Sequence, residues 1–178
     1  MNCSFVLTHA QEKFTRHILE GRGCGGMIKV IFFPGMGTLY SVSRDKKETI
    51  EIYPEAISAL RFLSRRGYEL VLLTPEYSEY KRFRAAVKDK TLSLHNFNPE
   101  KNDLSAFMEK QMISEEESFL ITDGLYWKYF QNTKARIILI LSGAGFCTLA
   151  GLEDDANEYF KDICKNIYAA AFSVAINN

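Results

Sequence analysis

The chain has 178 residues, of which 47% are hydrophobic and 25% are charged, a composition typical of one soluble globular domain with a substantial core. Lys plus Arg and Asp plus Glu balance at 22 each, so the chain lacks the overall basic field that attracts nucleic acid or an anionic membrane surface. No apolar run reaches the roughly 20 residues of a membrane span, and the N-terminus lacks a signal-peptide pattern.

The four cysteines are scattered along the chain, at Cys3, Cys24, Cys147 and Cys164. None of them lies in a Cys-x-x-Cys pair or near a histidine at metal-ligand spacing, so a zinc site is not expected. Scattered thiols are typical of a reducing compartment, and we therefore expect a cytoplasmic protein.

The first 26 residues differ in character from the rest. Ala10 to Glu20 predicts a short amphipathic helix, and residues 21–26 form a Gly-rich linker. We expect an N-terminal appendage over residues 1–26, followed by a single α/β domain over residues 27–178.

Strands and helices alternate from Met27 onward. In chain order, the pattern predicts a strand at 29–33, an extended segment at 48–53, a helix at 54–66, a strand at 69–74, a helix at 78–88, a strand at 91–97, a helix at 104–112, a strand at 118–123, a helix at 125–132, a strand at 136–141 and a closing helix at 158–175. Such alternation implies parallel strands joined by helical crossovers. The expected fold is therefore α/β, with helices on both faces of a Rossmann-like parallel sheet.

Open α/β sheets carry their reactive residues at the carboxyl ends of the strands. In this chain that edge should hold the segments Pro34–Thr38, Thr74–Glu76, His95–Lys101 and Asp123–Leu125. We expect these four segments to meet and to form the functional site.

The first of these segments resembles the opening motif of the haloacid dehalogenase (HAD)-like phosphatases, a strand followed by Asp-x-Asp-Gly-Thr-Leu. Gly37, Thr38 and Leu39 match this motif, whereas Pro34 and Met36 stand where the family has its two aspartates. The resemblance extends over most of residues 27–165 and implies a HAD-like fold without a large cap.

Three further segments carry the resemblance. Thr74 matches the Ser or Thr that holds the phosphoryl group in the family, and Lys101 is the best candidate for the family's lysine. Asp123 matches the first acid of the Gly-Asp-x-x-x-Asp motif, and Trp127 replaces the second. The tail is similar to that of histidinol-phosphate and heptose-bisphosphate phosphatases, but His95 is the only candidate zinc ligand between residues 90 and 110.

The resemblance implies a phosphatase-like protein that has lost its catalytic aspartates. In the family the first aspartate attacks phosphorus, and the second exchanges protons with the leaving group and with water. Pro34 has no nucleophile, and Met36 offers only a weakly accepting thioether. Mg²⁺ prefers carboxylate oxygens, and Asp123 is the clear acid that survives, although Glu76 or Asp103 could approach it. We therefore expect no catalytic residue and no cofactor.

Several functions stay open. The leading hypothesis is a catalytically inactive phosphatase-like protein that binds a phosphorylated small molecule through Gly37, Thr38, Thr74 and Lys101, or binds a protein partner. The alternative is an active phosphatase acting on a small phosphomonoester with Mg²⁺ and a non-standard nucleophile. A third is an unrelated doubly wound binding domain. Trp127 and the aromatic residues around it indicate either ordinary helix packing or a remodelled pocket.

Overall fold

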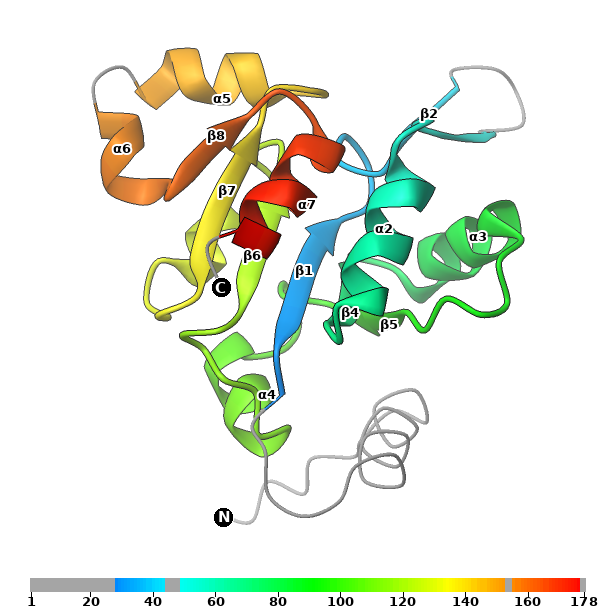
Figure 1. Ribbon diagram of the computed structural model, residues 1–178, viewed down its shortest axis with the longest axis horizontal. Helices are drawn as coiled ribbons and strands as arrows, with labels where there is room; N and C mark the ends of the chain where they lie inside the picture. Colours follow the sequence, from blue (N-terminus) through cyan, green and yellow to red (C-terminus); the bar gives the residue numbers. More distant parts are fainter. Residues whose placement is uncertain (1–27, 44–48, 153–154, 177–178) are drawn as a thin grey trace.

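The computed structural model describes residues 28–43, 49–152 and 155–176 and contains a six-stranded sheet (Figure 1). The strands follow the order β5-β4-β1-β6-β7-β8, and every neighbouring pair is parallel. They are β1 (Val30–Pro34), β4 (Glu69–Leu73), β5 (His95–Phe97), β6 (Phe119–Thr122), β7 (Arg136–Ile140) and β8 (Asp162–Cys164). The predicted appendage over residues 1–26 lies outside the described residues.

The central strands are buried along almost their whole length because helices cover both faces of the sheet. All five residues of β1 are buried, as are the last four of β4 and of β7. Alternate residues of each strand point to opposite faces, so Ile31 and Phe33 enter one core cluster and Val30 and Phe32 the other.

The helices divide into two layers. The first core cluster contains residues of α2 (Ala56–Arg65), α3 (Tyr77–Val87) and α7 (Ile167–Ile176). The second contains residues of α4 (Leu104–Lys110), of the 3₁₀ helix η1 (Trp127–Phe130) and of α6 (Ala156–Tyr159), with α5 (Gly145–Leu152) packed beside them. The three-layer α/β class expected from the sequence is confirmed.

The segment between β1 and α2 forms a small antiparallel hairpin, of which the sequence predicts only the second strand, as the extended segment at 48–53. Its strands are β2 (Tyr40–Val42) and β3 (Ile50–Ile52), and Tyr40 pairs with Ile52. The hairpin follows the turn after β1 directly, so it stands beside the carboxyl edge of the sheet (Figure 1).

The predicted closing helix at 158–175 is confirmed in its second part, as α7 (Ile167–Ile176), and is wrong over 162–164, where the chain forms β8. Its first part is occupied by the end of α6 and by β8, and α7 begins only at Ile167. The edge strand β8 is held by backbone pairing with β7, and the Lys161 amide also donates to the Ile137 carbonyl at 2.7 Å. Three residues are too few for a periodic pattern, so pairing with a distant segment decided this conformation.

Candidate functional site

The turn after β1 keeps a defined shape without ionisable side chains. Pro34 ends the strand and is buried, and the Gly35 amide donates to the Leu73 carbonyl at 3.3 Å. The Gly37 amide donates to the Tyr40 carbonyl at 2.8 Å. Two amides that could have bound an anion are therefore engaged within the chain, while the side chain of Met36 is 52% exposed.

Asp123 lies at the end of β6 and is only 4% exposed. Its Oδ1 accepts from the Thr38 hydroxyl at 3.3 Å, and its Oδ2 accepts from the Ala144 amide at 3.1 Å. The Asp123 amide donates to Thr38 Oγ1 at 3.2 Å, and its carbonyl accepts from the Thr148 hydroxyl at 3.0 Å. The structure thus brings the predicted residues Thr38 and Asp123 into contact.

Thr74 follows β4 and is buried. Its hydroxyl donates to Asn96 Oδ1 at 2.6 Å, and its amide donates to the Phe97 carbonyl at 3.1 Å. The hydrogen of this hydroxyl is therefore directed to the neighbouring strand β5. A phosphoryl group would have to compete with Asn96 for it.

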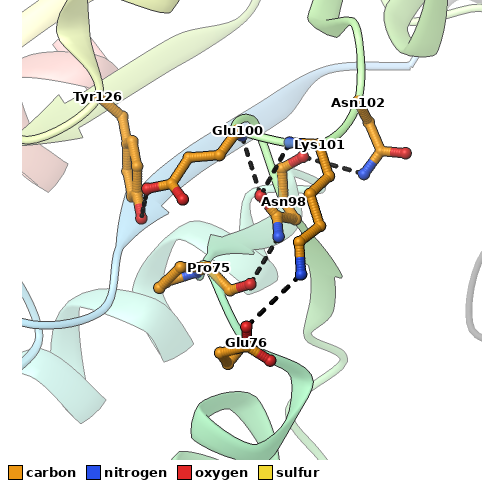
Figure 2. A network of polar contacts seen from close by, with 7 residues as sticks. All are labelled: Pro75, Glu76, Asn98, Glu100, Lys101, Asn102 and Tyr126. Atoms are coloured by element: carbon orange, nitrogen blue, oxygen red, sulfur yellow. Dashed lines mark hydrogen bonds and ion pairs between the residues drawn. The ribbon is translucent and has the colours of Figure 1, made fainter.

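Lys101 lies in a loop that is organised by a residue missed in the sequence analysis. The Asn98 side chain donates to the Pro75 carbonyl at 2.6 Å and accepts from the amides of Glu100 and Lys101 at 2.9 and 3.2 Å (Figure 2). The Lys101 ammonium lies 3.5 Å from Glu76 Oε1, and both side chains are about two-thirds exposed. Asn98 before Pro99 is a turn signal in the sequence and could have identified this loop.

Two tyrosine–glutamate pairs also lie at this edge. The Tyr40 hydroxyl donates to the Glu79 carboxylate, and the Tyr126 hydroxyl donates to Glu100 Oε1 at 3.4 Å. Burial, and next the neighbouring glutamate, raises the pKa of both tyrosines. A Cβ added to Gly35 would lie 2.6 Å from the Tyr40 hydroxyl oxygen, so the phenol packs against the turn after Pro34. No spacing in the sequence indicates these pairs.

The residues at this edge do not fit a magnesium ion. Across residues 28–43, 49–152 and 155–176, no group of three or more His, Cys, Asp or Glu side chains is arranged to hold a metal. Both oxygens of Asp123 accept hydrogen bonds from the protein. Glu76 faces Lys101, and Asp103 accepts from the Ala106 amide at 2.7 Å as the N-cap of α4.

Trp127 packs in the core. Its ring centroid lies 4.9 Å from that of Tyr159 and 5.7 Å from that of Phe160. The side chain belongs to the cluster between the sheet and α6, on the face opposite α2 and α7. Ordinary packing therefore accounts for this tryptophan.

The comparison with solved structures shows the fold. No family model matches the sequence, and no curated protein does. The structure of D,D-heptose 1,7-bisphosphate phosphatase from Burkholderia thailandensis has a TM-score of 0.65 at 15% identity, covering 83% of this chain and 98% of that one. The same phosphatase from B. bronchiseptica, complexed with magnesium and phosphate, has a TM-score of 0.61 at 13% identity, covering 85% and 100%.

A probable YrbI family phosphatase from Pseudomonas syringae has a TM-score of 0.57 at 12% identity and covers 96% of this chain and 91% of its own. Further structural neighbours include a putative HAD family hydrolase from Streptomyces avermitilis and a putative haloacid dehalogenase-like hydrolase from Bacteroides fragilis. The expectation of a HAD-like fold is therefore confirmed, and at these identities the likeness concerns the fold.

Proposed function

We propose that this chain is a catalytically inactive HAD phosphatase-like protein. The observation that carries the proposal is the buried Pro34 at the end of the central strand β1, where the resemblance implies the attacking aspartate. Proline has no side-chain nucleophile and no group that titrates, and the exposed Met36 thioether cannot transfer protons.

A second observation supports the proposal: the remaining polar groups of the site already form hydrogen bonds within the chain. Thr74 donates to Asn96, and Asp123 accepts from Thr38 and from the Ala144 amide. An active Mg²⁺-dependent phosphatase acting on a small phosphomonoester is the alternative, and the magnesium complex of one neighbour is consistent with that cofactor. The alternative needs a non-standard nucleophile next to the turn after β1, and the nearby Glu79 carboxylate is already bonded to Tyr40.

We propose that the protein is cytoplasmic and that it binds a protein partner rather than a phosphorylated small molecule. A phosphorylated small molecule at Gly37, Thr38, Thr74 and Lys101 would meet the carboxylates of the same edge. Exposed apolar side chains follow three adjacent strands there, with Met36 after β1, Leu125 after β6 and Phe146 after β7, at exposures of 52%, 41% and 67%. Exposed apolar side chains that lie together in one patch are typical of contact surfaces between proteins.

The test is Mg²⁺-dependent phosphate release from a panel of phosphomonoesters, with Asp123→Ala as the control. We expect no release above the buffer blank for either protein. Release by the wild type that is lost in the variant would overturn the proposal. Thermal unfolding with added inorganic phosphate tests the vestigial anion site, because a ligand that binds the folded state raises the midpoint. We expect no rise, and a rise that Lys101→Ala abolishes would favour a phosphorylated ligand.

A further inference from the structure

We infer that Asp123 is a hydrogen-bonded clamp that joins three loops at the carboxyl edge and does not hold a metal ion. The inference goes beyond the proposed loss of catalysis, since an inactive chain could still bind Mg²⁺ through this carboxylate. The three loops follow β1, β6 and β7, and they contribute Thr38, Asp123 and Ala144.

The hydrogen bonds of Asp123 use both its side chain and its backbone. The Thr38 hydroxyl donates to Oδ1 and accepts from the Asp123 amide, so one side chain satisfies two groups of the same residue. The Ala144 amide donates to Oδ2, and the Thr148 hydroxyl donates to the Asp123 carbonyl. Because the residue is almost fully buried, loss of these bonds would leave polar groups without water to replace them.

Glycines at two positions let the loops close on the carboxylate. A Cβ added to Gly37 would lie 1.9 Å from Asp123 Oδ2, and one added to Gly143 would lie 2.6 Å from the same atom. Both glycines have positive φ, +82° and +60°. Oδ2 is therefore enclosed by backbone, whereas Mg²⁺ binds its ligands at about 2.0–2.1 Å and usually keeps several waters.

The charge of Asp123 is balanced by hydrogen-bond donors. The Ala144 amide directly precedes the eight-residue helix α5, so the carboxylate faces the favourable end of its dipole. The carboxylate also helps to raise the pKa of Tyr53, after the larger effect of burial. Because the described residues present no metal-binding set of acids around it, removing Asp123 should destabilise the ion-free protein. In a metal site, removing one of several repelling carboxylates would relieve the ion-free protein instead.

Thermal unfolding with EDTA and with millimolar MgCl₂ distinguishes the two roles. We expect Asp123→Ala to lower the midpoint by about 4–8 °C, equally in both buffers, since about 2 kcal/mol is lost. Thr38→Val should lower it less, Thr38→Ser should restore most of that loss, and the double variant with Asp123→Ala should be less than additive. Asp103→Ala is the matched control, because it removes an acid from the same edge that caps only its own helix.

The inference is overturned if MgCl₂ raises the midpoint of the wild type but not that of Asp123→Ala, or if Asp123→Ala unfolds no earlier than the wild type in EDTA. If Asp123→Ala does not fold, Thr38→Val and Thr38→Ser decide, and equal midpoints for the two would contradict the clamp. These midpoints report on the clamp alone, whereas phosphate release reports on the proposed function, so either idea can fail without the other.

Discussion

The Tyr40 hydroxyl donates a hydrogen bond to the Glu79 carboxylate and so links the start of the hairpin to the first turn of α3. The two residues meet beside the turn after β1, and the Tyr40 ring stacks on Phe83 with centroids 5.3 Å apart. The phenol therefore contributes an apolar face to the core and a donor to the carboxyl edge. The donor can be tested without disturbing the ring.

Tyr40→Phe keeps the ring and removes the donor. We expect the free energy of unfolding to fall by about 1–2 kcal/mol, because a hydrogen bond to a charged group is lost in a partly buried setting. Urea denaturation followed by fluorescence measures the change. Glu79→Gln, which keeps an acceptor, serves as the control and should cause a smaller loss. An unchanged midpoint for Tyr40→Phe would contradict the contact.

Alkaline pH should destabilise the protein. Burial and Glu79 raise the pKa of Tyr40, and burial and Glu100 raise that of Tyr126. Burial, with Asp162, raises the pKa of the Cys164 thiol to about 11. A raised folded-state pKa means that the folded protein retains protons that the unfolded chain releases. Stability is therefore full below the unfolded pKa, about 8.5 for cysteine and about 10 for tyrosine, and falls as the pH rises above it.

Urea denaturation at a series of pH values from about 8 to 11 measures this slope. Tyr40→Phe should flatten the loss of stability above about pH 10, because one of the titrating groups is gone. An equally steep loss in the variant would mean that Tyr40 does not carry the effect.

Asn98→Ala should destabilise the protein more than Lys101→Ala. The Asn98 side chain makes one hydrogen bond to the loop after β4 and two within the loop after β5, so its loss should lower the free energy of unfolding by about 1–3 kcal/mol. The exposed Lys101–Glu76 pair should contribute below about 1 kcal/mol. Chemical denaturation of the two variants side by side measures the difference, and a larger effect at Lys101 would contradict the assignment of Asn98 as the organising residue.

The double variant Pro34→Asp with Met36→Asp should not become a phosphatase. The Glu79 carboxylate stays bonded to Tyr40 and the Thr74 hydroxyl stays bonded to Asn96, so neither group is free to assist the new carboxylates. A carboxylate at the buried position 34 should also lower the free energy of unfolding by about 1–3 kcal/mol. Phosphate release and thermal unfolding of the same preparation measure both effects. Restored Mg²⁺-dependent turnover would mean that the rest of the site is intact.

The sequence could predict the elements that carry strong local patterns. The continuous apolar runs at 29–33, 69–74, 118–123 and 136–141 all became strands of the parallel sheet. Of the predicted strand at 91–97, only the last three residues form a strand, and within the predicted helix at 125–132 only the short 3₁₀ helix η1 is present. Short elements depend on pairing and packing with distant segments, so a local pattern constrains them weakly.

The sequence predicted the site residues that stand at the ends of strands. The turn after β1 and Asp123 follow from strand ends, and the structure brings Thr38 and Asp123 together. The Tyr40–Glu79 and Tyr126–Glu100 contacts join segments that are distant in sequence. Nothing in the spacing of these residues indicates that they meet, because the crossovers of the sheet decide their proximity.

The strand order also constrains the order in which the sheet can form during synthesis. β1 lies inside the sheet between β4 and β6, and Ile31 and Phe32 pair with Phe119 and Leu120 on one side. During synthesis from the N-terminus, β4 emerges well before β6. Until Phe119 and Leu120 emerge, the nascent sheet therefore presents an apolar open edge along β1, which is a template for pairing with other chains. Completion of β6 both closes this edge and delivers Asp123 to Thr38.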